Sequence, residues 1–226
     1  ALAQPFVAEN GTEFNDFVLT ASYSNDSRDS AVFPTKGALQ SLIGEVAIPG
    51  SDLQYYRIRY KDRRYVPLTS RFTFSFRGDL GYGDGYGDLD FLPFFENYYA
   101  GGPQTVRGWE ANTLGPRETT LYRDPVGGNI LIAGSVELFA PPPIGGKFEK
   151  ALRLGAFFDF GNVWADADTD LVAPTGFDLG ELRYSAGLSA MWLSPVGALA
   201  VSIAYPINPA DDDDTQEFQF SFGQGF

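Results

Sequence analysis

The sequence lacks the residues on which most enzymes and metalloproteins depend. Its 226 residues include no cysteine and no histidine, which excludes disulfides, thiolate metal sites, and the most common general base and zinc ligand. An enzyme would have to use carboxylates, serine, lysine or tyrosine. Cations are also scarce: 16 Lys and Arg stand against 29 Asp and Glu, and the net charge of −13 argues against nucleic acid as a partner. No apolar run of about 20 residues is present, so no transmembrane helix is predicted.

Aromatic residues and glycine, by contrast, are abundant and follow a strand-like pattern. The chain has 20 Phe, 12 Tyr and 26 Gly, a composition that favours β-structure. Apolar and polar residues alternate with a period of two in nine segments, and no segment carries a convincing helical stripe. Tight turns such as Ser-Pro-Val-Gly at 194–197 indicate antiparallel neighbours. The predicted strands are 17–24, 38–48, 54–66, 71–80, 129–140, 152–164, 182–193, 198–205 and 218–226.

The two faces of these strands favour a membrane barrel over a soluble sandwich. Arginines and acids lie in mid-strand on the polar faces, whereas the apolar faces carry Tyr23, Trp192 and Tyr205 near strand ends, as an aromatic girdle would. Short and long connections largely alternate, as in outer-membrane barrels. We therefore predict an all-β fold: one antiparallel transmembrane β-barrel domain over residues 1–226, with about eight or nine strands in this chain.

The odd number of predicted strands needs an explanation, because bacterial single-chain barrels usually have an even number. The chain could be a piece of a larger barrel, or one strand could have escaped the pattern. A piece could also close on itself by pairing residues near 14–24 with 218–226.

The longest predicted connection, the outer loop 81–128, contains the most specific motif. Ordered domains rarely keep so long a loop without a function. Residues 94–116, FFENYYAGGPQTVRGWEANTLGP, closely resemble the sixth outer loop of the BamA family of outer-membrane β-barrel assembly factors. The family's Val-Arg-Gly-Phe/Tyr motif stands here as Val106, Arg107, Gly108 and Trp109. Further stretches that resemble the family are FPTKG (33–37), AIPGSD (47–52), GYGDG (81–85), FFDFGNVW (157–164), SAGLSAMWLSPVG (185–197) and EFQFSFGQGF (217–226).

This resemblance covers nearly the whole chain and carries expectations about fold and function. It implies the C-terminal nine of the sixteen strands of the family's barrel, without the periplasmic POTRA domains. It implies an outer-membrane protein of a Gram-negative bacterium that assembles and inserts other β-barrel proteins, with no enzymatic activity and no cofactor. The partners implied are the lipid bilayer and lipopolysaccharide, unfolded outer-membrane protein clients and, in the full protein, lipoproteins of the assembly machinery. Two departures from the family are Trp109, in place of Phe or Tyr, and Gln224, where client barrels commonly carry an aromatic residue.

Arg107 is the central cation of the loop motif, and two acidic residues are candidates to bind it. By strand parity, Glu137 and Asp159 point inward on sequential strands, so an arginine inside the lumen could pair with both. The resemblance implies the same anchor, because the family's loop arginine binds acids of the lumen wall and these two residues fall at matching places. We predict that Arg107 pins loop 81–128 inside the lumen. The alternative is a solvated loop cation.

The last strand, 218–226, is the second candidate site. In the family, a weak seam between the first and last strands templates client strands, a form of β-augmentation. Phe218, Phe220 and Phe222 share one face of this strand, and Phe226 resembles the C-terminal aromatic residue of an insertion signal. The resemblance implies that Gly223 helps the strand bend inward. The alternative is a glycine tolerated for packing.

Other functions and a metal site are less well supported. A polypeptide transporter of two-partner secretion shares the Val-Arg-Gly-aromatic motif, but the stretches 94–102 and 112–116 favour an assembly factor. A passive pore is disfavoured by the long loop. Acidic residues gather in the presumed outer loops, including 211–214, and divalent bridging to lipopolysaccharide is one interpretation. Residues 166–170, DADTD, lack the glycine and distal glutamate of a calcium loop, so we predict solvated loops and no metal site.

Overall fold

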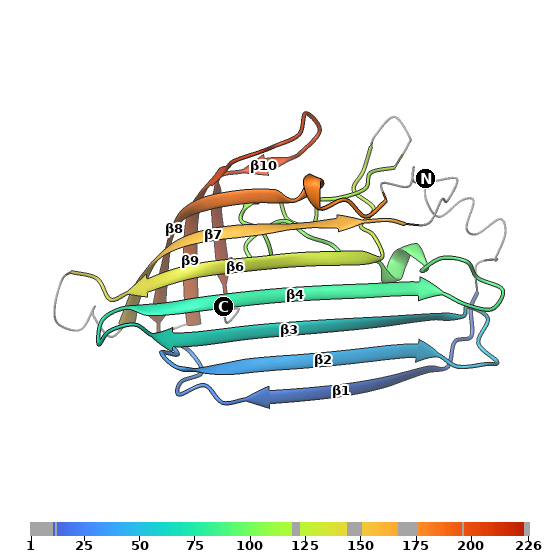
Figure 1. Cartoon of the computed structure of the whole chain (residues 1–226), viewed down its shortest axis with the longest axis horizontal. Helices are drawn as coiled ribbons and strands as arrows, with labels where there is room; N and C mark the ends of the chain where they lie inside the picture. The colour runs from blue at the N-terminus through green and yellow to red at the C-terminus, as the bar shows by residue number, and fades with distance from the viewer. Residues whose placement is uncertain are drawn as a thin grey trace.

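Nine long strands form a single curved antiparallel sheet (Figure 1). The computed structural model describes residues 11, 13–118, 123–143, 151–166, 176–195 and 197–223. The nine predicted strands are confirmed, with ends that differ by a few residues. In sheet order they are β1 (Val18–Asp26), β2 (Gly37–Ala47), β3 (Tyr55–Pro67), β4 (Thr73–Gly85), β6 (Ile130–Ala140), β7 (Leu152–Trp164), β8 (Arg183–Ser194), β9 (Gly197–Pro206) and β11 (Phe218–Phe222).

The remaining elements are short and belong to the connections. Strand β5 (Gly108–Trp109) pairs with β10 (Thr215–Gln216) in a separate two-stranded sheet that the alternation pattern did not predict. Two single turns of 3-10 helix, η1 (Phe94–Glu96) and η2 (Leu179–Glu181), lie in the connections after β4 and β7. Among the described residues, no helix is both long and apolar enough to cross a bilayer.

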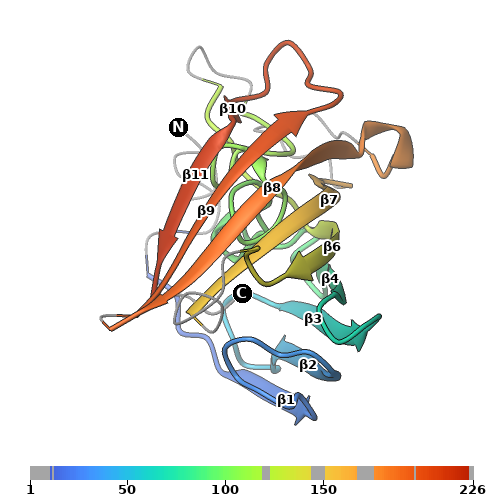
Figure 2. The ribbon, with the colours of Figure 1, turned by 90° about the vertical axis from the view of Figure 1, so that its left-hand side faces the viewer.

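The two faces of the sheet differ in polarity, as the alternation predicted. On β3, Ile58 is exposed on the outer face, whereas Arg57 and Arg59 point inward and pair with Glu45 and Asp79. Figure 2 shows the strands as an arc with the connection between β4 and β6 inside it. Large apolar side chains cover the convex face, and exposed fractions of 67% for Leu188 and 63% for Ile203 far exceed those of a water-soluble core. A lipid environment accounts for these exposures.

Strand β4 is longer than predicted, which shortens the loop. Residues 81–85 had been assigned to the loop 81–128, but they belong to β4, and the connection begins after Gly85. The glycines that made this stretch look like a loop serve packing instead. A Cβ atom on Gly81 would come within 2.9 Å of the Tyr98 ring, and one on Gly83 within 3.0 Å of Leu92. Small residues on the inner face of β4 thus make room for the returning loop.

Strand β11 is shorter than predicted. The prediction extended it to 226, but pairing with β9 ends at Phe222, and Gly223 follows the strand with a φ of 72°. The Gly223 N–H donates to the Ala198 carbonyl oxygen at 2.9 Å. A Cβ atom there would meet nothing within 4 Å, so backbone conformation rather than packing explains this glycine. Gln224 and the predicted signal residue Phe226 lie outside the described residues.

The two ends of the sheet are β1 and β11. Within the described part of the chain, β1 pairs with β2 and β11 pairs with β9, and no pairing joins 14–24 to 218–223. The described residues therefore do not show the self-closure that the sequence allowed, in which residues near 14–24 would pair with 218–226.

Candidate functional site

The connection between β4 and β6 folds back onto the concave face of the sheet (Figure 2). Its apolar residues form a buried cluster with the inner faces of β6 and β7, which explains why a loop of this length is ordered. Trp109 and Val106 are completely buried in this cluster. The cluster comprises Tyr98, Ala100, Val106, Trp109 and Leu114 of the loop with Leu131, Ala133 and Val163 of the sheet.

Gly108 allows the motif to approach the wall of the sheet. Its φ of 97° lies in the left-handed region that favours glycine. A Cβ atom at this position would also come within 3.3 Å of the Ala204 Cβ and 3.4 Å of the Ser185 Cβ. Both the backbone conformation and the close approach therefore require glycine between Arg107 and Trp109.

Arg107 and Asp159 form the central ion pair of the site. The Arg107 Nε donates to Asp159 Oδ2 at 2.7 Å, and its Nη2 donates to Oδ1 at 2.8 Å. The Arg107 backbone N–H adds a third bond to Oδ2 at 3.0 Å. The exposed fractions are only 4% for Arg107 and 0% for Asp159, so this bidentate pair is shielded from solvent.

Further groups complete the surroundings of the guanidinium. Glu137 Oε2 lies 3.1 Å from Arg107 Nη2, and Ser135 Oγ accepts a hydrogen bond from the same nitrogen at 3.1 Å. The Phe157 ring lies under the guanidinium, 3.4 Å from its carbon to the ring centroid. The structure thus brings together the three residues singled out from the sequence, Arg107, Glu137 and Asp159, and adds Ser135 and Phe157.

The electrostatics of the site favour the charged form of Arg107. Burial alone would lower the pKa of the guanidinium. The charges and hydrogen bonds of Asp159, and then of Glu137, outweigh burial and raise the pKa of Arg107 above its ordinary value. The second carboxylate is also bound from the wall, because Ser189 Oγ donates to Glu137 Oε1. One buried cation therefore serves two acids that would otherwise repel each other.

The loop motif also contacts the last strand. Gln219, buried on the inner face of β11, donates from Nε2 to the Trp109 carbonyl oxygen at 2.6 Å. Strand β5, formed by Gly108 and Trp109, pairs with β10 only two residues before β11. Phe218, Phe220 and Phe222 point outward from β11 and are exposed. The motif that binds β7 through Arg107 thus binds the start of β11 through Trp109.

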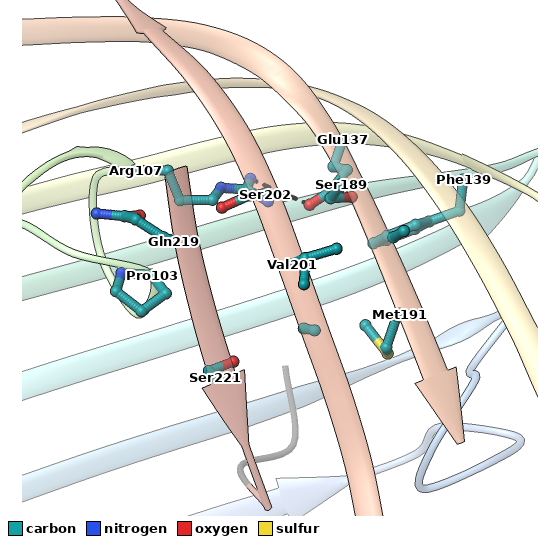
Figure 3. A pocket seen from close by; sticks show the side chains of 12 residues that line it. Pro103, Arg107, Glu137, Phe139, Ser189, Met191, Val201, Ser202, Gln219 and Ser221 are labelled. Atoms are coloured by element: carbon teal, nitrogen blue, oxygen red, sulfur yellow. Dashed lines mark hydrogen bonds and ion pairs between the residues drawn. The ribbon is translucent and has the colours of Figure 1, made fainter. Parts of the chain in front are cut away.

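A small cavity separates the anchor from the last strand. It has a volume of about 20 Å³ and is lined by Arg107, Glu137, Ser189, Gln219 and Ser221, among others. Figure 3 shows these side chains beside β9 and β11. Gln219 Oε1 and Ser221 Oγ have no hydrogen-bond partner among the described residues. The volume and the polar lining suit a single water molecule.

The acidic run 211–214 has a structural role that the sequence analysis missed. It was predicted to be solvated, but three of its carboxylates bind arginines: Asp212 binds Arg123 at 2.7 Å, Asp213 binds Arg183 at 2.5 Å and Asp214 binds Arg117 at 2.9 Å. Asp213 Oδ2 also accepts from Trp109 Nε1 at 3.3 Å. No sequence signal identified these partners, because Arg117 and Arg123 come from the connection between β4 and β6 and Arg183 is the first residue of β8.

Metal binding has little support in the described part of the chain. Among those residues, no three His, Cys, Asp or Glu side chains gather as a metal site would require. Most of the segment 166–170 lies outside the described residues.

Comparisons with known proteins agree on one family. Residues 2–226 match the model of the Omp85 superfamily domain. The chain is 38% identical to the outer membrane protein assembly factor BamA of Neisseria meningitidis, over 92% of this chain and 28% of that protein. It is 28% identical to the sorting assembly machinery 50 kDa subunit of Saccharomyces cerevisiae, over 92% of this chain and 43% of that protein.

A solved structure gives the same result. The crystal structure of BamA from Haemophilus ducreyi lacking POTRA domains 1–3 superposes with a TM-score of 0.84 and 28% identity, covering 97% of this chain and 46% of that one. The chain therefore has the fold of part of a BamA barrel and spans between about a quarter and a half of the length of these relatives. The bacterial relatives place it in the outer membrane of a Gram-negative bacterium.

Proposed function

Because the chain belongs to the Omp85 superfamily, we propose that it assembles and inserts outer-membrane β-barrel proteins, with β11 as the strand that templates incoming client strands. The role is not enzymatic: the barrier to insertion falls because a client strand finds hydrogen-bond partners at the edge of the sheet. The observation that carries the proposal is the position of β11. It ends the sheet order and pairs on one side only within the described residues.

The pairing of β11 is suited to such an exchange. It joins β9 through five residue pairs, from Phe218–Ile203 to Phe222–Leu199. By comparison, β8 and β9 share ten pairs, from Ser185–Pro206 to Ser194–Gly197. A short ladder holds the edge strand in place while leaving its other side able to accept a new strand. The outward side chains of β11 are exposed and apolar, so a client paired there would meet the bilayer directly.

The loop anchor has a defined part in this proposal. Arg107 fixes the motif to β7, and Gln219 and β10 fix the same motif to the last strand. The anchor therefore holds the start of β11 at a constant position, while the side of β11 that does not pair with β9 remains available to a client. The role proposed for Gly223 is to bend the end of the strand inward, through its left-handed backbone conformation, while its N–H still donates to the Ala198 carbonyl oxygen of β9.

The proposed binding partners of the protein are inferred from its exposed surfaces and from the names of its relatives. The exposed apolar face requires a lipid bilayer, in which lipopolysaccharide would be a neighbour. Unfolded outer-membrane proteins are the proposed clients, and the lipoproteins of the assembly machinery are proposed partners of the full protein. A passive pore fits less well, because the loop occupies the concave face that a pore would need to keep open (Figure 2).

A segment exchange tests the proposal. We would replace the matched segment of the Neisseria meningitidis relative with this chain and deplete the native protein. A photo-crosslinking residue at Phe222, on the edge strand, would report client contact. A matched probe at Leu188 has the same outward orientation, but β8 is paired on both sides. We expect growth, and client crosslinks at 222 but not at 188. A folded chimera in the outer membrane that supports no growth and crosslinks no client would contradict the proposal.

A further inference from the structure

A second hollow on the concave face carries an excess of positive charge. It has a volume of about 470 Å³ and is lined by residues of β1 to β4 and of the connection between β4 and β6. The side chains that matter here are Lys61, Arg63, Arg77 and Asp79 of the strands and Gln104 and Thr105 of the loop. It is separate from the Arg107 anchor, and in a chain of net charge −13 such a concentration of cations stands out.

Two of these cations oppose each other directly. Arg63 of β3 and Arg77 of β4 are partners in the antiparallel register. Strand parity points both side chains toward the concave face, with Arg59 and Lys61 along β3. Like charges at directly opposite positions destabilise a strand pair. Such a pair is expected where an anion between the two guanidinium groups turns the repulsion into attraction.

The acids on this face of the wall are already bound by other cations. Arg107 binds Glu137 and Asp159, at 3.1 Å and 2.7 Å. Asp79 is already bound by Arg59, at 2.8 Å to Nε and 2.7 Å to Nη2, and lies 3.9 Å from the Lys61 ammonium group. Asp62, the neighbour of Arg63 in sequence, is bound by Arg64 instead, at 2.7 Å.

Arg63 is left as the cation with spare donors. Arg77 donates from Nη2 to the Thr105 carbonyl oxygen at 2.7 Å, which is a neutral acceptor. Arg63 has no hydrogen-bond or ion-pair partner among the described residues, yet its side chain lines the hollow. Its side chain therefore borders a space that three further cations, Arg59, Lys61 and Arg77, also line.

We propose that Lys61, Arg63 and Arg77 form a binding site for an oxyanion, a carboxylate or a phosphate group, within the lumen. Guanidinium groups bind both through paired, charge-assisted hydrogen bonds. The hollow lies on the face opposite the lipid-facing side chains, so the anion comes from the aqueous side: a free phosphate compound, or an acidic side chain of a polypeptide in the lumen. This site does not depend on the assembly function, because its argument uses only the charges and their geometry.

Two probes distinguish the sources. The chain folded in detergent micelles would be titrated with pyrophosphate, and separately with a labelled peptide of alternating Asp and Ser or its Asn-and-Ser counterpart. Residues two apart in a strand are about 6.6–6.8 Å apart, so alternating acids match the spacing of Lys61 and Arg63. Arg63→Gln removes the proposed contact, Arg63→Lys keeps the charge, and Lys36→Gln removes an equal charge from an exposed turn.

The expected result has two parts. Arg63→Gln should weaken binding of pyrophosphate or the Asp peptide about tenfold or more, whereas Lys36→Gln should change it little and Arg63→Lys should restore part of it. Without ligand, Arg63→Gln should unfold at a higher temperature than the parent, because the repulsion from Arg77 is gone. Binding of the peptide alone identifies a polypeptide source, and binding of pyrophosphate alone identifies a free oxyanion. Binding that is unchanged in Arg63→Gln, or equal for Asp and Asn peptides with no pyrophosphate binding, would overturn the proposal.

Discussion

The pairing of Arg107 with Asp159 leads to the most demanding prediction. Replacing Arg107 by Ala leaves Asp159, whose exposed fraction is 0%, without its cation and with three hydrogen bonds removed or weakened. Breaking a buried pair by removing one partner typically costs about 3–5 kcal/mol, because the remaining charge is uncompensated. Glu137 would add repulsion to that cost. We therefore expect the free energy of unfolding to fall by about 3–5 kcal/mol in Arg107→Ala.

A double-mutant cycle separates the pair from its surroundings. Asp159→Asn alone should lower the free energy of unfolding by a similar amount. It removes the main counter-charge of Arg107 and leaves only Glu137 nearby. The double variant Arg107→Ala/Asp159→Asn contains neither stranded charge. Its loss of stability should be smaller than the sum of the single losses by about 2–3 kcal/mol, the upper range measured for residues in direct contact.

The measurement is denaturant unfolding in lipid vesicles, followed by tryptophan fluorescence, with heat-dependent gel mobility to check folding. Arg123→Ala is the matched control, because Arg123 pairs with Asp212 at the same distance of 2.7 Å but the two side chains are 61% and 44% exposed. We expect the control to cost about 0–1 kcal/mol. Additive effects in the cycle, or an Arg107→Ala loss no larger than that of the control, would refute a buried, coupled anchor.

Two further variants test the contacts around the motif with the same unfolding measurement. Gly108→Ala should lower the free energy of unfolding more than Gly50→Ala. Both glycines have a φ near 100°, which strains alanine by about 1–3 kcal/mol. Only at Gly108 would a Cβ atom meet neighbours within 3.4 Å. Asp213→Asn should lower the free energy of unfolding by about 1–3 kcal/mol, because Asp213 accepts hydrogen bonds from Arg183, Trp109 and a backbone N–H. Asp211→Asn, at an exposed position, should change it little. If Gly108→Ala and Gly50→Ala lost equal stability, or Asp213→Asn and Asp211→Asn did, the contacts of Gly108 or of Asp213 would contribute nothing to stability.

The strands and the anchor were accessible from the sequence for a simple physical reason. A strand has a side-chain period of two, so a single alternating run determines both its extent and which residues face inward. Parity alone therefore placed Glu137 and Asp159 on the inner wall, and the long loop supplied the cation. The same period of two puts Gln219 on the face opposite Phe218 and Phe220, the face from which it contacts Trp109.

The predictions from the sequence were wrong where the contacts of a residue depend on the path of a loop. Gly81 and Gly83 interrupt the side-chain pattern of β4, so a packed strand resembled a flexible connection. Tyr98 and Leu92 pack against these two positions, which explains why neither carries a side chain. The prediction for the acidic run failed for a related reason. Two of the three donors to Asp213, Trp109 and Arg183, come from distant segments, so the local sequence does not distinguish Asp213 from Asp211.

The loop motif joins two parts of the barrel wall through adjacent residues. Arg107 is held by β7, and Trp109, only two residues later, is held by Gln219 of β11 and by Asp213. Gly108 between them is constrained by its pairing with Gln216 and by its contact with Ala204. Because these adjacent residues are all constrained, a displacement of Arg107 should be transmitted to the last strand. Arg107→Ala should consequently increase hydrogen exchange at β11 more than at β2, which is far from the motif in the sheet order. Equal exchange at both strands would mean that the anchor and the edge strand are mechanically independent.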